Sequence, residues 1–323
     1  MIKSYFYNRS EDTIIYDIDL KQKDEYLQNP NNLLWIDIYD CTSEDLAVLA
    51  RVFDFHPLAI EDCLQVSPRA KVDRYDNYYF FVFHALRYNE ESDEEITTAE
   101  LDVFLGSNYL ITIHKEALPS VARLVKQCWY STRLMQRGPD YVLYNIVDGI
   151  VDEYFPILER IGVRIDELED EIYTNPAREI TEEFLALKRT ILLLRKVIIP
   201  QKRIFANVNG RYSFQIMEDN KPYYMDLVDH IEGIIDATDT YRDLVNGAVD
   251  TYYSIISNRT NEVMRVLTII STIILPLTFI TGLFGMNVTF PFGDSKWAIW
   301  GITAFMVVMT GMMLGYFYRR NWL

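Results

Sequence analysis

The stretch VLTIISTIILPLTFITGLFGMN, residues 266–287, decides the architecture of this chain. No Asp, Glu, Lys or Arg occurs from residue 266 to residue 293, and a second stretch without them covers residues 297–318. A helix needs about 20 mainly apolar residues to cross a bilayer core of roughly 30 Å. The sequence therefore predicts a membrane protein with two spans, residues 265–284 and 297–318, joined by a loop over residues 285–296.

Basic residues flank the two spans on one side. Arg265 begins the first span, Arg319 and Arg320 open the tail (residues 319–323), and the connecting loop carries only Lys296. The positive-inside rule then places both termini in the cytoplasm and the loop outside the cell. The N-terminus lacks the apolar segment of a signal peptide, which favours a cytoplasmic front end anchored in the cell (inner) membrane.

The front of the chain is acidic and water-soluble in character. The sequence holds 47 acidic and 31 basic residues, a formal net charge of -16, which argues against nucleic acid as a partner. Cations are natural ligands of such a surface, although an acidic balance more often serves only solubility. Three widely spaced cysteines argue against a disulfide framework or a thiolate metal site. They are Cys41, Cys63 and Cys128.

Residues 1–220 are predicted to form a cytoplasmic α/β domain that ends in a helical hairpin. The expected strands are residues 33–38, 78–84, 101–105 and 109–114, the last two forming a hairpin that turns at 106–108. Thr42 is expected to cap a short helix. The helical hairpin is expected at residues 141–173, with a kink at Pro156, and at residues 180–199, ended by Pro200.

A long helix is predicted to connect this domain to the membrane. No proline occurs between Pro222 and Pro276, and the helical pattern continues into the first span. Residues 221–264 are therefore expected to be the cytoplasmic part of one stalk helix. The fold class is an α+β (α/β) cytoplasmic domain followed by a very long helix and a transmembrane hairpin.

One face of this helix is small, polar or flexible along most of its length. Spacings of four and three alternate along it, which keeps its members on one side of a helix. These residues are Asp250, Ser254, Ser257, Asn261, Met264, Thr268, Ser271, Leu275, Thr278 and Gly282. Small residues in a span commonly serve helix packing. Because the stripe continues outside the membrane, where lipid packing explains nothing, we favour a water-filled path, which needs several copies of the chain.

Three apolar residues interrupt the polar character of this face or lie beside it. Met264, Leu267 and Leu275 would form apolar rings in a narrow tube, and such rings close pores by dewetting. Pro276 removes a backbone hydrogen bond and would bend the span. The sequence leaves open whether this bend is a hinge.

Residues 261–323 resemble the CorA family of divalent-cation transporters, and a weaker similarity covers most of the soluble part. The resemblance rests on the segments 261–268 and 276–282, on Gly285-Met286-Asn287 between the spans, and on the terminal Asn321-Trp322-Leu323. It implies a homopentamer with one central pore that conducts Mg²⁺ inward, driven by the membrane potential. It also implies that Gly285, Met286 and Asn287 form the outer selectivity ring. The pore-facing residues would include Asn261, Met264, Leu267, Ser271, Leu275 and Thr278.

The resemblance further implies regulation by intracellular Mg²⁺, which would be both cargo and regulatory ligand. Asp62 and Asp226 would form a site between subunits, with Glu61, Asp148 and His230 near a second one. Facing carboxylates repel one another until a cation bridges them, so binding would clamp the closed state. From the residues alone, Glu61 and Asp62 are more often a solvated helix end.

Other functions remain open at this stage. A relative that favours Co²⁺, Ni²⁺ or Zn²⁺ is the nearest alternative, although no His or Cys occurs in residues 231–323 and softer metals prefer such ligands. The outer loop keeps only Asp294 as an acidic residue, which departs from the pattern common in the family. No catalytic histidine motif supports a membrane-anchored enzyme, and the polar stripe argues against a tethered scaffold.

Overall fold

The computed structural model describes residues 1–88, 96–174, 178–206, 213–286 and 296–322. The chain divides into two compact units. The first comprises Met1–Glu171 with Ala177–Gly247, and the second comprises Ile172–Pro176 with Ala248–Leu323.

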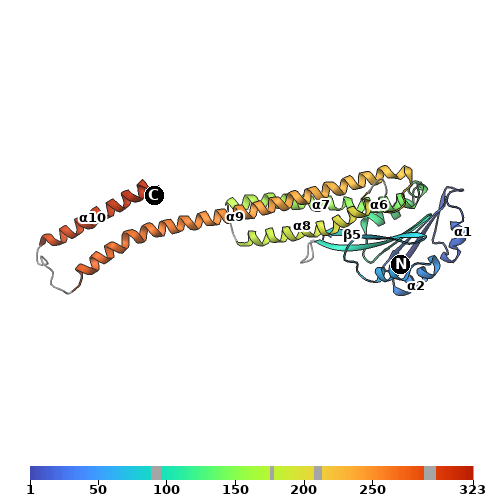
Figure 1. Cartoon of the computed structure of the whole chain (residues 1–323), viewed down its shortest axis with the longest axis horizontal. Coiled ribbons are helices and arrows are strands. Elements are labelled where there is room, and N and C mark those ends of the chain that lie inside the picture. Colours follow the sequence, from blue (N-terminus) through green and yellow to red (C-terminus); the bar gives the residue numbers. More distant parts are fainter. Residues whose placement is uncertain (89–95, 175–177, 207–212, 287–295, 323) are drawn as a thin grey trace. The chain divides into compact units, whose positions relative to one another are not determined.

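A seven-stranded sheet forms the centre of the first unit (Figure 1). Its strands lie in the order β2-β1-β3-β7-β6-β5-β4; β3 and β7 are parallel, and the other neighbours are antiparallel. The strands are β1 (Ile2–Asn8), β2 (Thr13–Tyr16), β3 (Leu33–Tyr39), β4 (Lys71–Arg74), β5 (Tyr78–Tyr88), β6 (Ile96–Gly106) and β7 (Tyr109–His114). The four predicted strands are confirmed as β3, β5, β6 and β7, whereas β1, β2 and β4 were not predicted.

The β6–β7 hairpin turns where the sequence predicted it. Leu105 pairs with Leu110, and residues 106–108 make the connection. A Cβ atom on Gly106 would lie 2.1 Å from Cε1 of Tyr109, so this position has room only for glycine.

Helices cover both faces of the sheet, which makes three layers. On one face, Phe80, Phe104 and Ile111 share a core with Leu49 and Phe53 of α2. On the other, the ring of Phe83 stacks on Phe205 with centroids 5.8 Å apart, and α6 packs on four strands. The helices up to α6 are α1 (Lys23–Leu27), α2 (Ser43–Phe53), α3 (Pro57–Leu64), α4 (Pro119–Cys128), α5 (Arg133–Gln136) and α6 (Pro139–Asp152), with 3₁₀ turns at Leu20–Gln22 and Glu218–Asn220. Thr42 and Asp45 form the expected cap of α2.

The helix predicted over residues 141–173 is two helices. α6 ends at Asp152, and α7 (Tyr154–Thr174) begins after Glu153. Pro156 therefore lies in the first turn of α7, where a missing amide costs no helical hydrogen bond. The break, rather than a kink at Pro156, separates the two segments.

The prediction that Pro200 ends a helix is wrong. α8 (Arg178–Phe205) continues through Pro200 for more than one further turn. The residues after the proline are anchored in the core: Gln201 is fully buried and donates from Nε2 to the carbonyl of His84 at 2.8 Å. The buried rings and amide contacts of this turn offset the proline penalty of about 3 kcal/mol.

The long helix is confirmed as α9 (Lys221–Phe284), which has 64 residues and contains Pro276. α10 (Lys296–Arg319) follows it. Both contain windows long and apolar enough to cross a membrane, with mean hydropathies of 2.2 and 1.6. The predicted limits of the membrane segments and of the other domains stay predictions.

Candidate functional site

The predicted stripe on α9 is open to its surroundings in the second unit. Met264 is 54 % exposed, Leu267 53 % and Leu275 67 %. The polar members Asp250, Ser254, Ser257, Asn261, Thr268 and Thr278 are exposed too, and Ser271 is half-buried. The stripe is thus a surface of the single chain.

The covered face of α9 is a different one. Ile269 is 8 % exposed, and Ile273, Pro276 and Ile280 are partly buried. These residues repeat at helical spacing, and at 100° per residue their face lies roughly 150° around the helix from Met264. The stripe therefore lies away from the one buried residue of this segment, Ile269. Apolar residues on other sides of α9, such as Val263 and Ile274, are as exposed as the stripe, so its polar composition rather than its exposure sets it apart.

Two hydroxyl groups of the stripe, those of Ser254 and Thr268, donate hydrogen bonds to their own helix. Thr268 Oγ1 donates to the carbonyl of Met264 at 2.7 Å, and Ser254 Oγ donates to the carbonyl of Asp250 at 3.0 Å. A hydroxyl that donates in this way keeps its oxygen lone pairs as acceptors. Such oxygens can accept hydrogen bonds from the water around a hydrated cation without adding charge to the span.

The predicted selectivity segment begins at the end of α9. Gly285 N donates to the carbonyl of Thr281 at 2.9 Å, and Met286 N donates to the carbonyl of Leu283 at 3.4 Å. The thioether of Met286 is exposed. Asn287 lies outside the described residues.

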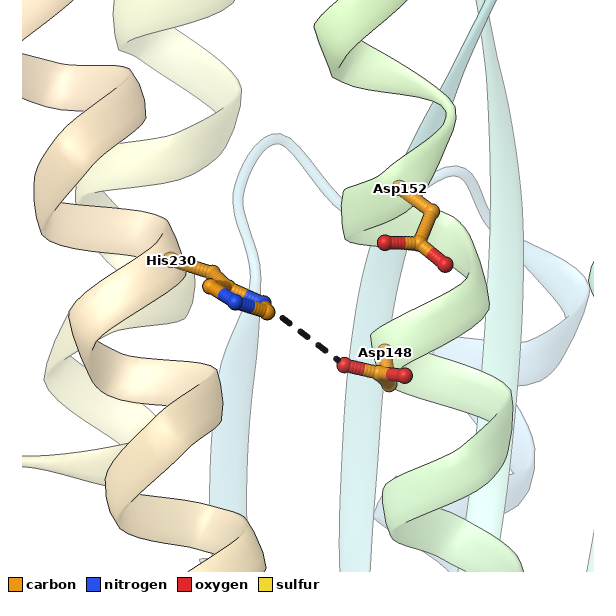
Figure 2. A group of neighbouring side chains, drawn as sticks. All are labelled: Asp148, Asp152 and His230. Carbon is orange, nitrogen blue, oxygen red and sulfur yellow. Dashed lines mark ion pairs between the residues drawn. The ribbon is translucent and has the colours of Figure 1, made fainter.

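A cluster of possible metal ligands lies in the first unit, where α6 faces α9 (Figure 2). Asp148 and Asp152 project from α6 and His230 projects from α9, with one ligand atom of each within 4.8 Å of the others. His230 Nδ1 lies 3.9 Å from Asp148 Oδ1. The structure brings together Asp148 and His230, which the resemblance had placed near one site with Glu61, and adds Asp152, which the sequence analysis missed. Its spacing of four from Asp148 within a predicted helix was the available signal.

The cluster has unused ligand capacity. Asp148 Oδ1 and His230 Nδ1 are buried atoms that lack a hydrogen-bond partner among the described residues. Burial raises the pKa of Asp148, the nearby carboxylates of Asp152 and Asp226 raise it further, and His230 and Arg123 act against them. A buried carboxylate with acidic neighbours gains from a bound cation.

Asp226 extends this cluster along α9. Its Oδ2 lies 3.9 Å from His230 Nε2, one helical turn away, and the side chain is largely exposed. The structure therefore joins Asp226 to the group that the sequence analysis had assigned to a second site.

Glu61 and Asp62 lie on α3 with other partners. Lys71 Nζ is 2.6 Å from Asp62 Oδ2, and Glu61 Oε1 accepts from Gln65 Nε2 at 3.2 Å. Within the described part of one chain, no hydrogen bond or ion pair links either residue to Asp148, Asp226 or His230.

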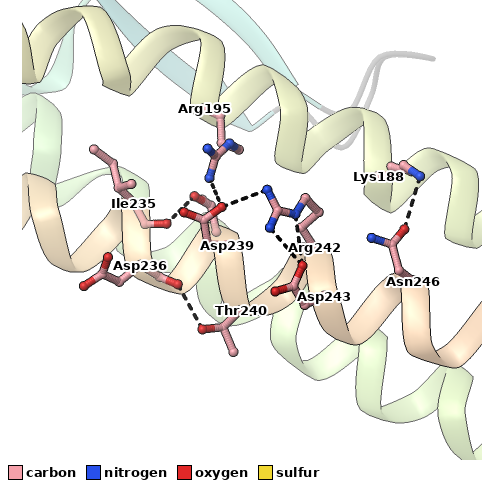
Figure 3. A network of polar contacts seen from close by, with 10 residues as sticks. Lys188, Arg195, Ile235, Asp236, Asp239, Thr240, Arg242, Asp243 and Asn246 are labelled. Carbon is pink, nitrogen blue, oxygen red and sulfur yellow. Dashed lines mark hydrogen bonds and ion pairs between the residues drawn. The ribbon is translucent and has the colours of Figure 1, made fainter.

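Charged contacts fix α9 against α8 beyond the cluster (Figure 3). Arg195 of α8 pairs with Asp239 of α9, which also lies 3.1 Å from Nη1 of Arg242. About two turns away on both helices, Lys188 Nζ donates to Asn246 Oδ1 at 3.2 Å. These contacts set the rotation of α9 about its axis within the first unit.

Comparison with known proteins identifies the family. The model of a family described as "CorA-like Mg2+ transporter protein" matches residues 30–319. The chain belongs to this family. The CorA resemblance of the C-terminal sequence is thereby confirmed over most of the chain.

Individual relatives agree. The chain is 36 % identical over 293 residues to the cobalt/magnesium transport protein CorA of Thermotoga maritima, covering 90 % of this chain and 83 % of the relative. The corresponding CorA of Methanocaldococcus jannaschii is 27 % identical over 305 residues, covering 93 % and 94 %. The complete structure of the CorA magnesium transporter from Methanocaldococcus jannaschii superimposes with a TM-score of 0.84 at 24 % identity, covering 100 % of this chain and 99 % of that one, which supports the fold.

CorA membership settles the broad class of the protein. It is a membrane protein and a divalent-cation transporter rather than an enzyme, and α9 and α10 fit its two spans. The roles of the individual site residues and the mechanism go beyond what family membership establishes.

Proposed function

We propose that the protein takes up Mg²⁺ passively through a central pore lined by α9 in a homopentamer. The observation that carries this proposal is the row of small and polar side chains that follows one side of α9 from Asp250 to Gly282 and, apart from the half-buried Ser271, is exposed in the single chain. A helix face that contacts water inside a bilayer must be shielded from lipid by other faces that contact the same water. Identical copies of the chain around one axis supply those faces.

The membrane potential suffices to drive entry. A unit charge gains about 2.3 kcal/mol in crossing 100 mV, so a divalent ion gains roughly twice as much. Mg²⁺ sheds its water reluctantly. The hydroxyls of Ser271 and Thr278, together with the amides of Asn261 and Asn287, can contact the hydrated ion through neutral oxygens. A carboxylate ring would hold the ion more tightly and slow its release.

Apolar rings supply the closed state of this pore. Met264, Leu267 and Leu275 project from the open side of α9. Brought together around an axis, they would exclude water where the tube is narrow. Opening then requires only a small separation or rotation of the α9 helices.

Intracellular Mg²⁺ regulates this opening through the acidic groups of the first unit. Asp148, Asp152, Asp226 and His230 form the part of the sensor within one chain, and the neighbouring subunit contributes Asp62 with Glu61. Bound cations cancel the repulsion between carboxylates and hold the subunits in the closed arrangement. When internal Mg²⁺ falls, the repulsion returns and the pore opens.

The orientation follows from the basic residues. Arg265, Arg319 and Arg320 stay on the cytoplasmic side, so both termini lie in the cytoplasm and the segment around Asn287 faces outward. The protein is then an inner-membrane protein whose sensor reads the ion concentration on the side that the ion enters.

A preference for Co²⁺ is the second candidate, and His230 is the observation that favours it. Imidazole is a good ligand for Co²⁺, Ni²⁺ and Zn²⁺ and a poor one for Mg²⁺. Two relatives carry cobalt as well as magnesium in their names. The proposed pore itself offers oxygen and thioether groups but no imidazole or thiolate. Mg²⁺ therefore remains the first candidate for the transported ion.

Ion flux into proteoliposomes tests the transport proposal. Mg²⁺, Co²⁺, Ni²⁺ and Zn²⁺ are compared with and without an inside-negative potential. Wild-type protein should admit Mg²⁺ in a potential-dependent way, and Asn287→Ala should abolish uptake while Asn258→Ala, at an exposed position of α9 outside the stripe, should not. Equal Mg²⁺ flux in both variants would remove the selectivity assignment.

Cysteine accessibility tests the pore face itself. Leu275→Cys should let a charged, water-soluble thiol reagent block the flux, whereas Ile273→Cys on the covered face should not. Wild-type protein supplies the baseline for its three native cysteines. Block at Ile273→Cys alone would show that the wrong side of α9 has been assigned to the pore.

A further inference from the structure

Lys71 already supplies a positive charge to the carboxylate that the proposed sensor needs. Lys71 opens β4, and its Nζ lies 2.6 Å from Asp62 Oδ2 of α3. The side chains of both residues are about one-third exposed. An ion arriving between subunits therefore meets a carboxylate whose charge is partly cancelled within its own chain.

A second carboxylate, that of Asp73, contacts the same lysine. Asp73 Oδ2 lies 2.9 Å from Lys71 Nζ. Lys71 and Asp73 are two residues apart on β4, so their side chains share one face of the strand. The ammonium group is thus held between Asp62 and Asp73, and loss of either contact leaves it with the other.

The ammonium group keeps its charge in this position. Burial acts to lower the pKa of Lys71, but hydrogen bonds to Asp62 and Asp73 outweigh burial, and the pKa lies above its ordinary value. The ammonium group also lies over the ring of Phe80, whose centroid is 5.9 Å from Nζ. Lys71 is therefore a fixed positive charge rather than a titrating one at neutral pH.

We propose that Lys71 is a tethered competitor for the regulatory divalent cation: Asp62 and Asp73 share it when the ion is absent, and it stays with Asp73 alone when the ion binds Asp62. This inference rests on the proposed role of Asp62 in the sensor. Asp73 makes the exchange easier, because the lysine keeps one carboxylate partner instead of passing into water. The pair of carboxylates around Lys71 then sets the cation concentration at which the sensor responds.

Two substitutions should move the sensor in opposite directions. Lys71→Gln frees Asp62 and should tighten divalent binding about two- to fivefold, the range expected for loss of a partly exposed ion pair. Asp73→Asn removes the alternative partner, ties Lys71 to Asp62, and should weaken binding about twofold. Lys71→Arg retains the charge and should stay near wild type, which a purely steric role of Lys71 would not predict.

The measurement is Mn²⁺ binding to the full-length protein in detergent, followed by electron paramagnetic resonance of free Mn²⁺ and by competition with Mg²⁺. Asp62→Asn defines the class of bound Mn²⁺ that depends on this site, and Lys21→Gln on the exposed surface is the matched control. Thermal unfolding of each variant verifies that it is folded.

The outcomes separate the two proposals. If Asp62→Asn removes a class of bound Mn²⁺ while Lys71→Gln and Asp73→Asn leave that class unchanged, or shift it in the same direction, the competitor role is wrong and the sensor stands. If Asp62→Asn changes nothing, the sensor assignment of Asp62 fails and the role of Lys71 fails with it.

Discussion

His230 of α9 faces Asp148 of α6 across 3.9 Å, measured from Nδ1 to Oδ1. This separation is too long for a hydrogen bond. It is at the long end of the range for an ion pair. An ion bound by both atoms, with bonds of about 2.0–2.1 Å, would lie close to the line between them, as with two ligands on opposite sides of a metal.

Substitutions in this pair should affect metals unequally. His230→Gln should weaken Co²⁺ and Ni²⁺ binding by about tenfold or more and Mg²⁺ binding much less, because only the softer ions gain strongly from imidazole. Asp148→Asn should weaken all of them. Isothermal titration of the full-length protein with each metal provides the measurement, with Asp229→Asn, exposed on the same turn of α9, as the control. Equal losses for Mg²⁺ and Co²⁺ in His230→Gln would argue against direct ligation by the ring.

The stability of the first unit should depend on pH through His114. Burial opposes the charged ring, but the hydrogen bond with Asp37 (Nε2 to Oδ1, 3.2 Å) and the charge of Asp37 outweigh burial, so the pKa of His114 is raised. The folded state then binds the proton more tightly than the unfolded state. This stabilisation is complete below about pH 6.5 and is lost as the pH rises through the higher folded-state pKa.

Replacement of His114 by Gln isolates that charge. The variant should unfold at a lower temperature than wild type at about pH 6, and the difference should shrink as the pH approaches roughly 8.5. A loss near 1–2 kcal/mol at the acidic end corresponds to one charge-assisted hydrogen bond. Thermal unfolding at several pH values provides the test, and a difference that grows with pH would contradict the assigned sign.

The substitution Gly149→Ala should disturb the metal cluster through the contact between α4 and α6. A Cβ on Gly149 would lie 2.9 Å from Ser120 Cβ and 2.3 Å from Nη2 of Arg123, so α4 and α6 must move apart. Gly149→Ala should cost about 1–3 kcal/mol of stability and weaken divalent binding at the neighbouring Asp148. Gly233→Ala, on α9 with open space around it, is the control. Unchanged unfolding and metal binding in Gly149→Ala would show that the α4–α6 contact tolerates the added volume.

The membrane segments and the long helix were predictable because their signals are local. A run without charges and a stretch without proline identify α9 and α10 with no knowledge of what they contact. β2 and β4 are four-residue edge strands. β4 reads KVDR, whose composition gives little sign of a strand, whereas β2 reads TIIY, which consists of strand formers and was missed because the run is short. Each pairs with its neighbour along the chain, β1 or β5, in a local hairpin. The long-range pairing in this sheet is that of β3 with β7, which local patterns do not contain.

The residues of the candidate site likewise fall into those that local sequence patterns could predict and those that they could not. The stripe was predictable because its members share one helix. Asp152 could have been found from its spacing, whereas the pairing of Lys71 with Asp62 depends on how β4 lies beside α3. At Pro200 a local signal was misleading. A proline usually marks the end of a helix, but the buried packing of Gln201 and Phe205 keeps α8 helical beyond it.

The open stripe of α9 also bears on how such a conduit can change. In an assembly of identical chains, each residue that faces the axis occurs once in every subunit. A single substitution at Leu275 or Thr278 therefore changes a complete ring of side chains. The effect of a small change in one side chain is thereby multiplied by the number of subunits. In assemblies that mix wild-type and variant subunits, even a mild defect in transport would become measurable.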